Sequence, residues 1–527
     1  MAILTSCWCI DLGIILIGAF IGIYNFYQKK FKHWKKYNIP HSKPKFPFGD
    51  LISITTMGEN FVLTLDRIYK SFEKEKVGGI WAFFHPILIV RDVEVIKDIL
   101  VKEFMSFHDR GVPVDEKNDP LSAHLFSISG SKWRNLRAKL TPTFTSGKMK
   151  MMFPILVESG REMISILEPN AINKDIVEMK DILARFTTDV IASCAFGIDS
   201  NSLKNPDTEF RKMGRKIVEP SFANILRNFS FMAMPTLVKI FKIKLIPEYL
   251  ANFFMGSVRE TMDYREQNNV KRNDFMQLLI QLKNKGKLDD VDEIKEKTDD
   301  GNEIKELEVE ENRSDQKFSF EEAAAQAFIF FVAGFETSST TMVLALYELA
   351  LQPEIQEKVR NEIKTVLGKH NGKITYEAAF GMDYLGNVID ETLRKYPVAG
   401  VIIRQCNKDY KIPDSDMVIP KGTSTHIPIY SLHYDSKYFP NPEKFDPDRF
   451  TEEVKSQRPR YAYLPFGEGP RHCIGMRFGL MQTRVGLIEL LLNYKFEICE
   501  KSPVPLKFSS MSFTPKEGMH LRLSKVN

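Results

Sequence analysis

The stretch "LPFGEGPRHCIG", residues 464–475, surrounds one cysteine, Cys473, with glycines and an arginine. A zinc site would need further ligands at short spacing, but the next cysteine, Cys499, lies 26 positions downstream. The six cysteines of the chain also show no paired framework for disulfides. A structural cysteine in a core would have bulky neighbours rather than flexible ones. We therefore expect a loop that lets another group come very close to one sulfur.

The chain has 527 residues, of which 43% are hydrophobic, and its formal net charge is +5. This length is ample for a large buried core, and by itself it favours two or more domains. Nucleic-acid binding would require clustered basic residues with interleaved aromatic ones on a strongly basic domain. The mild basic excess gives no such cluster, so we expect no nucleic-acid partner.

Residues 1–28 have the pattern of an uncleaved membrane anchor. Between Cys7 and Tyr27 the strongly polar residues are Asp11 and Asn25 alone, which leaves about the 20 apolar residues that a span needs. A cleaved signal peptide would carry its charges at the other end. A buried N-terminal helix is the alternative, and the lysines that follow argue against it. They would also hold the rest of the chain in the cytoplasm: Lys29, Lys30, Lys32, Lys35 and Lys36.

The next segment, residues 29–50, is a basic and proline-rich linker that we expect to be stiff and extended. The main domain should span residues 51–527. Within it, residues 289–312 hold twelve acidic residues against three lysines, which predicts a solvated, mobile linker. Residues 78–90 are rich in β-branched and aromatic residues and predict a β-hairpin. The periodicity of residues 91–400 is mainly helical.

One long helix is predicted from Phe320 to the residue before Pro353. Ser319 and Glu322 form a capping box at its start, and its length of about 50 Å is enough to cross a large domain. Its apolar character all round indicates a helix buried in the centre. Yet its middle reads "AGFETSSTT", with poor helix formers and a glutamate that is costly to bury. Either Glu336 reaches solvent, or this part of the helix needs space, a hydroxyl and a carboxylate.

Four stretches become specific when they are combined. The cysteine stretch fits Phe-x-x-Gly-x-x-x-Cys-x-Gly, and "ETLR" places Glu391 and Arg394 on one helix face. "FDPDRF" supplies Arg449, and "AGFETS" lies within the long helix. In this order and spacing the chain resembles the cytochrome P-450 superfamily of haem-thiolate monooxygenases, over essentially everything after the anchor. The wording of residues 320–342 and 463–479 is most similar to the insect microsomal xenobiotic-metabolising clade.

This resemblance implies a fold that is mainly α with a small β-rich lobe, preceded by one transmembrane helix. Cys473 would be the axial thiolate of a haem b iron. Gly469 would permit a tight turn, and Gly475 would let the following helix, which begins near Ile474, approach the porphyrin. The N-terminal N–H groups of that helix would stabilise the thiolate. Phe466 would screen the loop from water, and the neighbouring His472 would point away from the ring.

The resemblance also assigns cations to the two haem propionates. These residues are Trp133, Arg137, Arg404, Arg471 and, as a weaker candidate, Arg110. Taken singly, each arginine would more often be a surface residue. Glu391, Arg394 and Arg449 are interpreted as a structural network, in which removing one partner would leave a buried charge uncompensated.

Within the long helix, the resemblance implies that Ala333 and Gly334 open a groove for O₂. Thr337 would hydrogen-bond the bound oxygen, and Glu336 would feed protons through water. Family members that rearrange peroxides commonly lack this acid–alcohol pair, so its presence favours a true monooxygenase. It also argues against a haem carrier or sensor without turnover.

The expected function is insertion of one atom of O₂ into an apolar small molecule, such as a plant toxin or insecticide. A dedicated hydroxylase of one endogenous steroid or lipid remains the alternative. Electrons would come from NADPH through NADPH–cytochrome P-450 reductase, with cytochrome b5 as a further candidate, because the chain has no dinucleotide fingerprint. The expected location is the endoplasmic reticulum membrane, with the catalytic domain on the cytoplasmic face. Substrate contacts are expected from residues 110–130 and 222–254. A reductase dock is expected at Lys132, Arg134, Lys139, Lys148 and Lys150.

Overall fold

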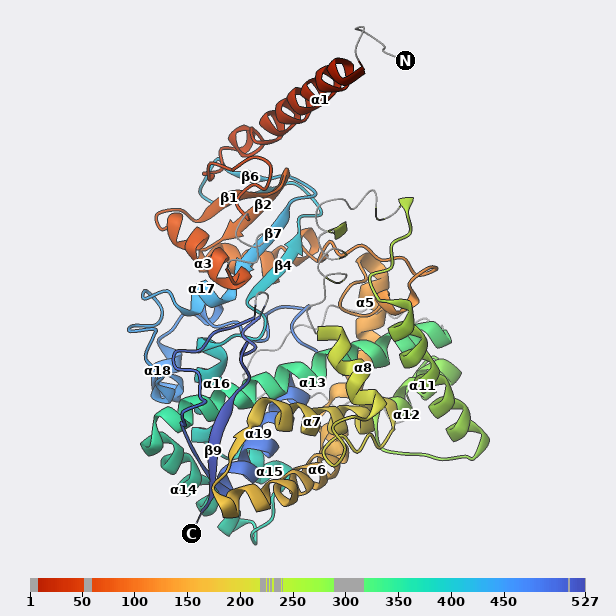
Figure 1. The fold of residues 1–527 in the computed structure, drawn as a ribbon, viewed down its shortest axis with the longest axis vertical. Helices are drawn as coiled ribbons and strands as arrows, with labels where there is room; N and C mark the ends of the chain where they lie inside the picture. The colour runs from red at the N-terminus through yellow and green to blue at the C-terminus, as the bar shows by residue number, and fades with distance from the viewer. Residues whose placement is uncertain are drawn as a thin grey trace.

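A computed structural model represents the chain and describes residues 8–51, 59–218, 240–288, 317–509 and 512–526, together with the isolated residues 224, 227, 230, 231 and 238. The predicted acidic linker, residues 289–312, lies outside the described residues. So do most of residues 222–239, the first part of the predicted substrate-contact segment 222–254. Figure 1 shows a mainly helical body, a smaller β-rich part beneath the N-terminal helix, and α13 running through the middle.

The described residues of the body contain the following α-helices. They are α3 (Phe61–Ser71), α4 (Val93–Lys97), α5 (Gly130–Leu140), α6 (Ser146–Asn173), α7 (Met179–Ile191), α8 (Glu209–Val218), α11 (Glu248–Gln267), α12 (Phe275–Lys285), α13 (Phe320–Leu351), α14 (Pro353–Lys369), α15 (Tyr376–Phe380), α16 (Asp383–Lys395), α17 (Ile429–His433), α18 (Glu452–Ser456) and α19 (Met476–Asn493). The long-helix prediction is confirmed, because α13 has 32 residues and the Ser319–Glu322 capping box closes its start.

The strands form three small sheets. In the largest, the order is β1 (Val77–Ala82), β2 (His85–Val90), β7 (Ser424–Pro428) and β4 (Val401–Gln405). β1 and β2 pair as the predicted hairpin, with Val77 opposite Val90. The second sheet has the order β3 (Ile176–Glu178), β9 (His520–Lys525) and β8 (Tyr494–Glu497), and the third joins β5 (Tyr410–Lys411) to β6 (Val418–Ile419).

The centre of the body is formed by α13 packed between α7 and α19. Small residues permit the close approach. A Cβ at Gly334 of α13 would meet Cδ1 of Ile191 on α7 at 2.8 Å, and a Cβ at Gly479 of α19 would touch Oγ of Ser338 at 3.8 Å. Most of the second half of α13 is buried. α13 is therefore the element against which the others are positioned.

The N-terminal helix α1 (Trp8–Lys30) projects from the β-rich end of the body, as Figure 1 shows. By length and composition, two helices of the described residues could cross a membrane. One is α13, which is mostly buried in the body, and the other is the helix that begins at Trp8, whose apolar side chains are largely exposed. The predicted linker, residues 29–50, is not simply extended: its first two residues end α1, and Trp34–Tyr37 form a 3₁₀ helix. Trp34 is fully buried and donates to the Ile80 carbonyl of β1 at 3.1 Å.

Candidate active site

The loop that holds Cys473 is closed by its own backbone. The Cys473 N–H donates to the Phe466 carbonyl at 2.9 Å, and the His472 N–H donates to the Gly469 carbonyl at 3.0 Å. Gly469 has a φ of +72°, and a Cβ there would overlap the Leu100 carbonyl oxygen. The turn therefore requires glycine at 469 for both its conformation and its close approach.

The Cys473 side chain is accessible although protein surrounds it closely. Burial raises the pKa of its thiol, while the Gly475 N–H and the charges of Arg137 and Arg110 act to lower it. Gly475 is the N-cap of α19, so the N-terminus of that helix lies close to the sulfur. The helix begins at Met476, two residues later than the predicted start near Ile474. The Gly475 N–H and the two arginines therefore act to stabilise a thiolate, against the effect of burial, at a sulfur that another group can reach.

Two of the predicted arginines contact the loop before α5. Arg110 donates to the Phe126 carbonyl at 2.8 Å, and its guanidinium lies 4.0 Å from the centre of the Phe126 ring. Arg471 donates to the Ile128 carbonyl at 2.6 Å and lies 4.4 Å from the centre of the Trp133 ring. The Arg471 guanidinium therefore stacks on the ring of Trp133, the predicted tryptophan of α5.

The other two arginines approach the same region from α5 and β4. Arg137, one turn after Trp133, donates to the His472 carbonyl at 3.0 Å. Arg404 is 2% exposed and donates to the Ile403 carbonyl at 2.9 Å. Its pKa is lowered well below the usual value, by burial and then by repulsion from Arg110 and Arg471.

The charges of this arginine cluster (Arg110, Arg137, Arg404 and Arg471) are not balanced by the protein around them. Within the described part of the chain, one carboxylate, Asp109, comes within ion-pair distance, 3.9 Å from Arg471. Burial lowers the pKa of Arg110 and Arg137 to about 10 and that of Arg471 to about 9. Buried cations need anionic partners. Four guanidiniums beside a reachable sulfur therefore fit a ligand with two carboxylates, which is what a haem carries.

His472 does not present a free ring nitrogen to such a ligand. Its Nδ1 lies 2.8 Å from the Gly469 carbonyl oxygen, and its Nε2 lies 3.4 Å from Nη2 of Arg137. Both ring nitrogens of His472 therefore face protein groups. No cluster of three or more His, Cys, Asp or Glu side chains suited to a metal occurs among the residues that the structure describes.

The middle of α13 lies against the start of α19. On one side, Phe144 links them, since its ring centre is 5.2 Å from that of Phe330 and it lies 3.7 Å from a Cβ built on Gly475. On the other side, Ser338 meets Gly479. In the sequence of α13, the contact residues Phe330 and Ser338 lie before and after Ala333, Gly334, Glu336 and Thr337. The predicted acid–alcohol pair therefore lies near the N-terminal end of α19, which Cys473 precedes.

The four α13 residues differ in what they face. Ala333 is exposed within a helix whose neighbours are mostly buried, and the Thr337 hydroxyl donates to its carbonyl at 2.6 Å. Gly334 faces Ile191, so its missing side chain makes room for α7. The space available to a small ligand on this helix is therefore on the Ala333–Thr337 side.

Glu336 is held by an ion pair that the sequence did not predict. Its Oε1 lies 2.8 Å from Nζ of Lys180 on α7 and accepts from the Thr514 hydroxyl at 3.3 Å. Lys180 Nζ also donates to the hydroxyls of Ser339 and Thr340, both at 3.0 Å. Lys180 and Thr514 lie in no recognisable sequence motif. The one signal in the sequence was Glu336 itself, because a glutamate within an apolar helix needs a cation beside it.

The Glu391–Arg394 pair is fully buried. Arg394 donates from Nε to Glu391 Oε2 at 2.7 Å and from Nη2 to Oε1 at 2.9 Å. Arg449 joins it, with Nε 3.5 Å from Glu391 Oε1. His433, which the sequence analysis missed, connects this network to the cysteine loop, because it accepts from the Leu464 N–H at 3.0 Å. Burial lowers the pKa of His433 to about 3 and keeps it neutral.

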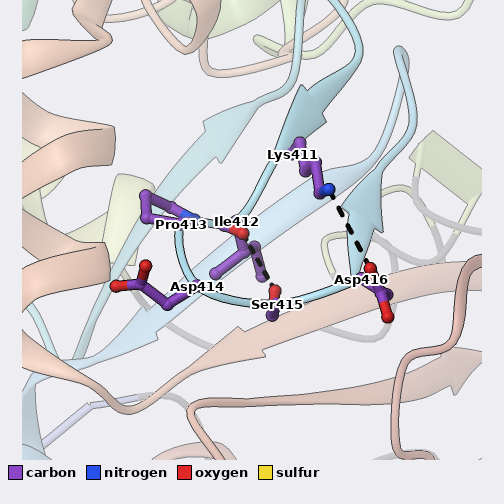
Figure 2. A pocket seen from close by; sticks show the side chains of 6 residues that line it. All are labelled: Lys411, Ile412, Pro413, Asp414, Ser415 and Asp416. Carbon is purple, nitrogen blue, oxygen red and sulfur yellow. Dashed lines mark hydrogen bonds and ion pairs between the residues drawn. The ribbon is translucent and has the colours of Figure 1, made fainter.

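A depression elsewhere on the surface has a different character. Figure 2 shows that it follows the turn between β5 and β6, lined by residues 411–416. Lys411 and Asp416 lie 3.9 Å apart there, and both side chains are exposed. Exposed pairs of this kind contribute little, and no predicted site residue lies in this turn.

Comparisons with known proteins agree with this geometry. A sequence model described as Cytochrome P450 matches residues 40–522. The chain is 42% identical over 524 residues to probable cytochrome P450 6a14 of Drosophila melanogaster, which covers 97% of this chain and 99% of that protein. It is 40% identical to cytochrome P450 6k1 of Blattella germanica, covering 97% and 96% of the two chains. It is also 40% identical to cytochrome P450 6a2 of Drosophila melanogaster, covering 95% and 96%.

Proposed function

The chain belongs to the cytochrome P450 family of haem monooxygenases, and on this premise we propose that it oxidises apolar xenobiotics at the Cys473 site. One observation carries the assignment of the site. A reachable cysteine sulfur lies beside the four guanidiniums of the arginine cluster, which have one protein carboxylate within ion-pair distance in the described residues.

In this proposal Cys473 would hold the iron of haem b through its sulfur, and Arg110, Trp133, Arg137, Arg404 and Arg471 would bind the propionates. The haem supplies the activation of O₂, one atom of which enters the substrate while the other leaves as water. The Gly475 N–H favours negative charge on the sulfur, against the effect of burial. Gly469 keeps the loop tight, and Phe466 covers it.

Thr337 and Glu336 are proposed to manage protons at the site. The Thr337 hydroxyl donates to the Ala333 carbonyl, and its oxygen can still accept a hydrogen bond. Oε1 of Glu336 pairs with the Lys180 ammonium and accepts from the Thr514 hydroxyl. We propose that protons pass from its other oxygen, Oε2, through water to the Thr337 side of the helix. Glu391, Arg394 and Arg449 are proposed to hold the fold behind the cysteine loop rather than to act in the reaction.

The two electrons are proposed to come from NADPH through NADPH–cytochrome P-450 reductase, with cytochrome b5 as a second donor. The proposed dock is the basic surface around α5. Lys132 and Lys150 there pair with Glu116 and Glu377, both at 2.8 Å, and both lysines are half exposed or more. We further propose that α1 anchors the protein in the endoplasmic reticulum membrane with the body in the cytoplasm.

The proposed substrates are apolar foreign compounds such as plant toxins or insecticides. This proposal follows the insect relatives, and a panel of such compounds incubated with the protein, reductase and NADPH tests it. Turnover of one endogenous steroid or lipid alone would instead indicate a dedicated hydroxylase.

The test of the site itself is Cys473→Ser, with Cys499→Ser as the matched control. We expect Cys473→Ser to lose the strongly red-shifted absorption of the reduced CO complex, because the thiolate causes that shift. Cys499 is half-buried and hydrogen-bonded near Ser502 and His520, away from the arginine cluster, so its variant should keep the band. If the band survives in Cys473→Ser, another residue is the ligand.

A further inference from the structure

Three hydroxyls near the C-terminus, those of Ser509, Ser512 and Thr514, form a hydroxyl chain that ends on Glu336. Thr514 donates from Oγ1 to Glu336 Oε1 at 3.3 Å, and Ser512 donates to Thr514 Oγ1 at 3.0 Å. The Ser509 and Ser512 hydroxyl oxygens lie 2.9 Å apart. A hydroxyl can accept one hydrogen bond while it donates another. The hydroxyl chain can therefore pass a proton from Ser509 to Glu336.

The loop that carries the hydroxyl chain is fixed on the body. Phe513, between the last two hydroxyls, is 2% exposed. The Ser509 N–H donates to the Thr514 carbonyl at 2.9 Å, and the buried Asn60 side chain donates to the Ser512 carbonyl at 3.1 Å. These contacts hold the backbone at both ends of the hydroxyl chain, so its donors and acceptors stay within hydrogen-bond distance.

The hydroxyl chain leads out of the core, which the other groups at Glu336 Oε1 do not. Lys180 lies 2.8 Å from Oε1 with a side chain that is 13% exposed, and Thr340, 3% exposed, donates to it at 3.5 Å. Ser509 and Ser512 are half-buried, so water can contact that end of the hydroxyl chain. Among the described residues that bond to Oε1, Thr514 therefore provides the connection toward solvent.

We propose that the hydroxyl chain is a proton relay that resupplies Glu336 during turnover. When Oε2 of Glu336 gives a proton toward the Thr337 side, Oε1 takes the proton of the Thr514 hydroxyl. Thr514 takes the proton of Ser512, Ser512 takes that of Ser509, and Ser509 takes one from solvent. One proton enters for each that leaves, so no charge remains on the hydroxyl chain. The three residues act through Glu336, and the relay rests on the proposed function, because the reduction of O₂ consumes the protons.

The first test removes the Thr514 hydroxyl from the full-length, haem-loaded protein in the presence of reductase, NADPH and a substrate. Thr514→Val keeps a branched side chain that cannot donate, so product per NADPH should fall by roughly 3- to 30-fold while hydrogen peroxide rises. This loss is below the typical ~10²–10⁴-fold contribution of positioned proton transfer, because Lys180 still lies at Oε1. Thr514→Ser restores a hydroxyl and should restore most of the coupling.

Ser512→Ala interrupts the next link and should also lower product per NADPH. Ser502→Ala is its matched control. Ser502 is likewise a half-buried serine near the C-terminus, but its hydroxyl donates to the His520 carbonyl and accepts from the Cys499 N–H. It should keep wild-type coupling. Wild-type coupling in both Thr514→Val and Ser512→Ala would overturn the relay.

Glu336→Gln as a background separates the relay from a contact with substrate or a packing role. Glutamine has no carboxyl proton to pass on, so Thr514→Val should lower the coupling no further in that background. The same fold loss in both backgrounds would overturn the relay and show that Thr514 acts independently of Glu336.

Infrared difference spectra of the resting proteins give a readout that needs no turnover. The difference between wild type and Glu336→Gln identifies the carboxylate bands of Glu336. These bands should shift in Thr514→Val, because one donor to Oε1 is lost, and return in Thr514→Ser. Unshifted bands would overturn the hydrogen bond on which the relay depends. If the wild-type protein forms no product from any substrate, the proposed function fails and the relay fails with it. If the wild type is coupled and Thr514→Val equals it, the relay alone fails.

Discussion

Glu336 lies within a mostly buried helix and meets a cation there, because Lys180 Nζ lies 2.8 Å from its Oε1. Lys180 directs its ammonium at three oxygens of α13, those of Glu336, Ser339 and Thr340, and an ammonium has three protons to donate. Burial lowers the pKa of Lys180, and the charge of Glu336 opposes that shift. The pair is therefore satisfied on the α7 side of the helix, and Thr337 remains on the other side with Ala333.

At this scale, Thr337→Ala separates catalysis from haem binding. The variant should keep its haem content, because the hydroxyl donates only to the Ala333 carbonyl of its own helix. Positioned proton transfer contributes typically about 10²–10⁴-fold, so product formed per NADPH consumed should fall while hydrogen peroxide rises. The measurement is the ratio of product to NADPH, with peroxide counted alongside.

Thr341→Ala is the matched control for this prediction. Thr341 lies one turn further along α13, is buried, and makes the same kind of hydrogen bond, to the Thr337 carbonyl at 3.0 Å. It should keep wild-type coupling. If both variants remain coupled, the hydroxyl of Thr337 has no part in proton delivery.

At the scale of elements, the contact between α7 and α13 determines the position of the candidate site. The Thr187 hydroxyl of α7 donates to the Phe335 carbonyl of α13 at 2.7 Å, next to the close approach of Ile191 and Gly334. The sequence interpretation assigned Gly334 to an O₂ groove together with Ala333. The packing adds a second reason for a glycine, which is the Ile191 side chain.

Gly334→Ala tests the packing reason. In an unobstructed helix this change stabilises by about 0.5–1 kcal/mol. Here the new methyl would lie 2.8 Å from Ile191 Cδ1, so overpacking should lower the free energy of unfolding by about 1–3 kcal/mol. Denaturant unfolding measures it.

Two further variants make the interpretation specific. Gly368→Ala in α14 meets nothing within 4 Å and should be neutral or stabilising. Ile191→Val removes the Cδ1 methyl, so Gly334→Ala should cost less in that background. An equal cost in both backgrounds would show that Ile191 is not the obstacle.

At the scale of the whole molecule, α1 is attached to the body by aromatic side chains rather than by a free linker. Tyr27 packs against Phe46 and Phe84 with ring centres 5.0 and 5.5 Å apart, and Phe26 lies 5.3 Å from Phe84. The first part of α1 exposes its apolar residues, among them Leu16 and Ile17. The proposed anchor therefore ends in a collar that holds it against the β-rich end.

Two truncations distinguish the anchor from the collar. Removing residues 1–24 and removing residues 1–28 should both weaken membrane binding, measured by retention after a salt wash. Exposed Ile240 and Phe241 could retain part of it. Only the longer deletion removes Phe26 and Tyr27, so it should be less stable by about 1.5–4.5 kcal/mol, at about 0.5–1.5 kcal/mol for each of the three aromatic pairs. Full retention of both proteins on washed membranes would contradict the anchor, and equal stability would contradict the collar.

The local features of this protein follow from the sequence by itself, because their determinants lie within a few residues of one another. The capping box and Pro353 set the bounds of α13, the β-branched run set the hairpin, and the i, i+3 spacing set the Glu391–Arg394 pair. The glycines around Cys473 indicated a loop that another group approaches, and Gly469 does have the positive φ that such a turn requires.

Only the tertiary structure decided which distant groups meet. Lys180 and Thr514 at Glu336, His433 between Arg394 and Leu464, and Asp119 at Leu245 each join segments with no shared local pattern. The balance of charge around the four arginines is equally non-local, since it depends on which carboxylates the fold brings near them. A sequence shows that a buried charge needs a partner, but the packing of the helices selects the partner, because burial and contact arise between elements rather than along the chain.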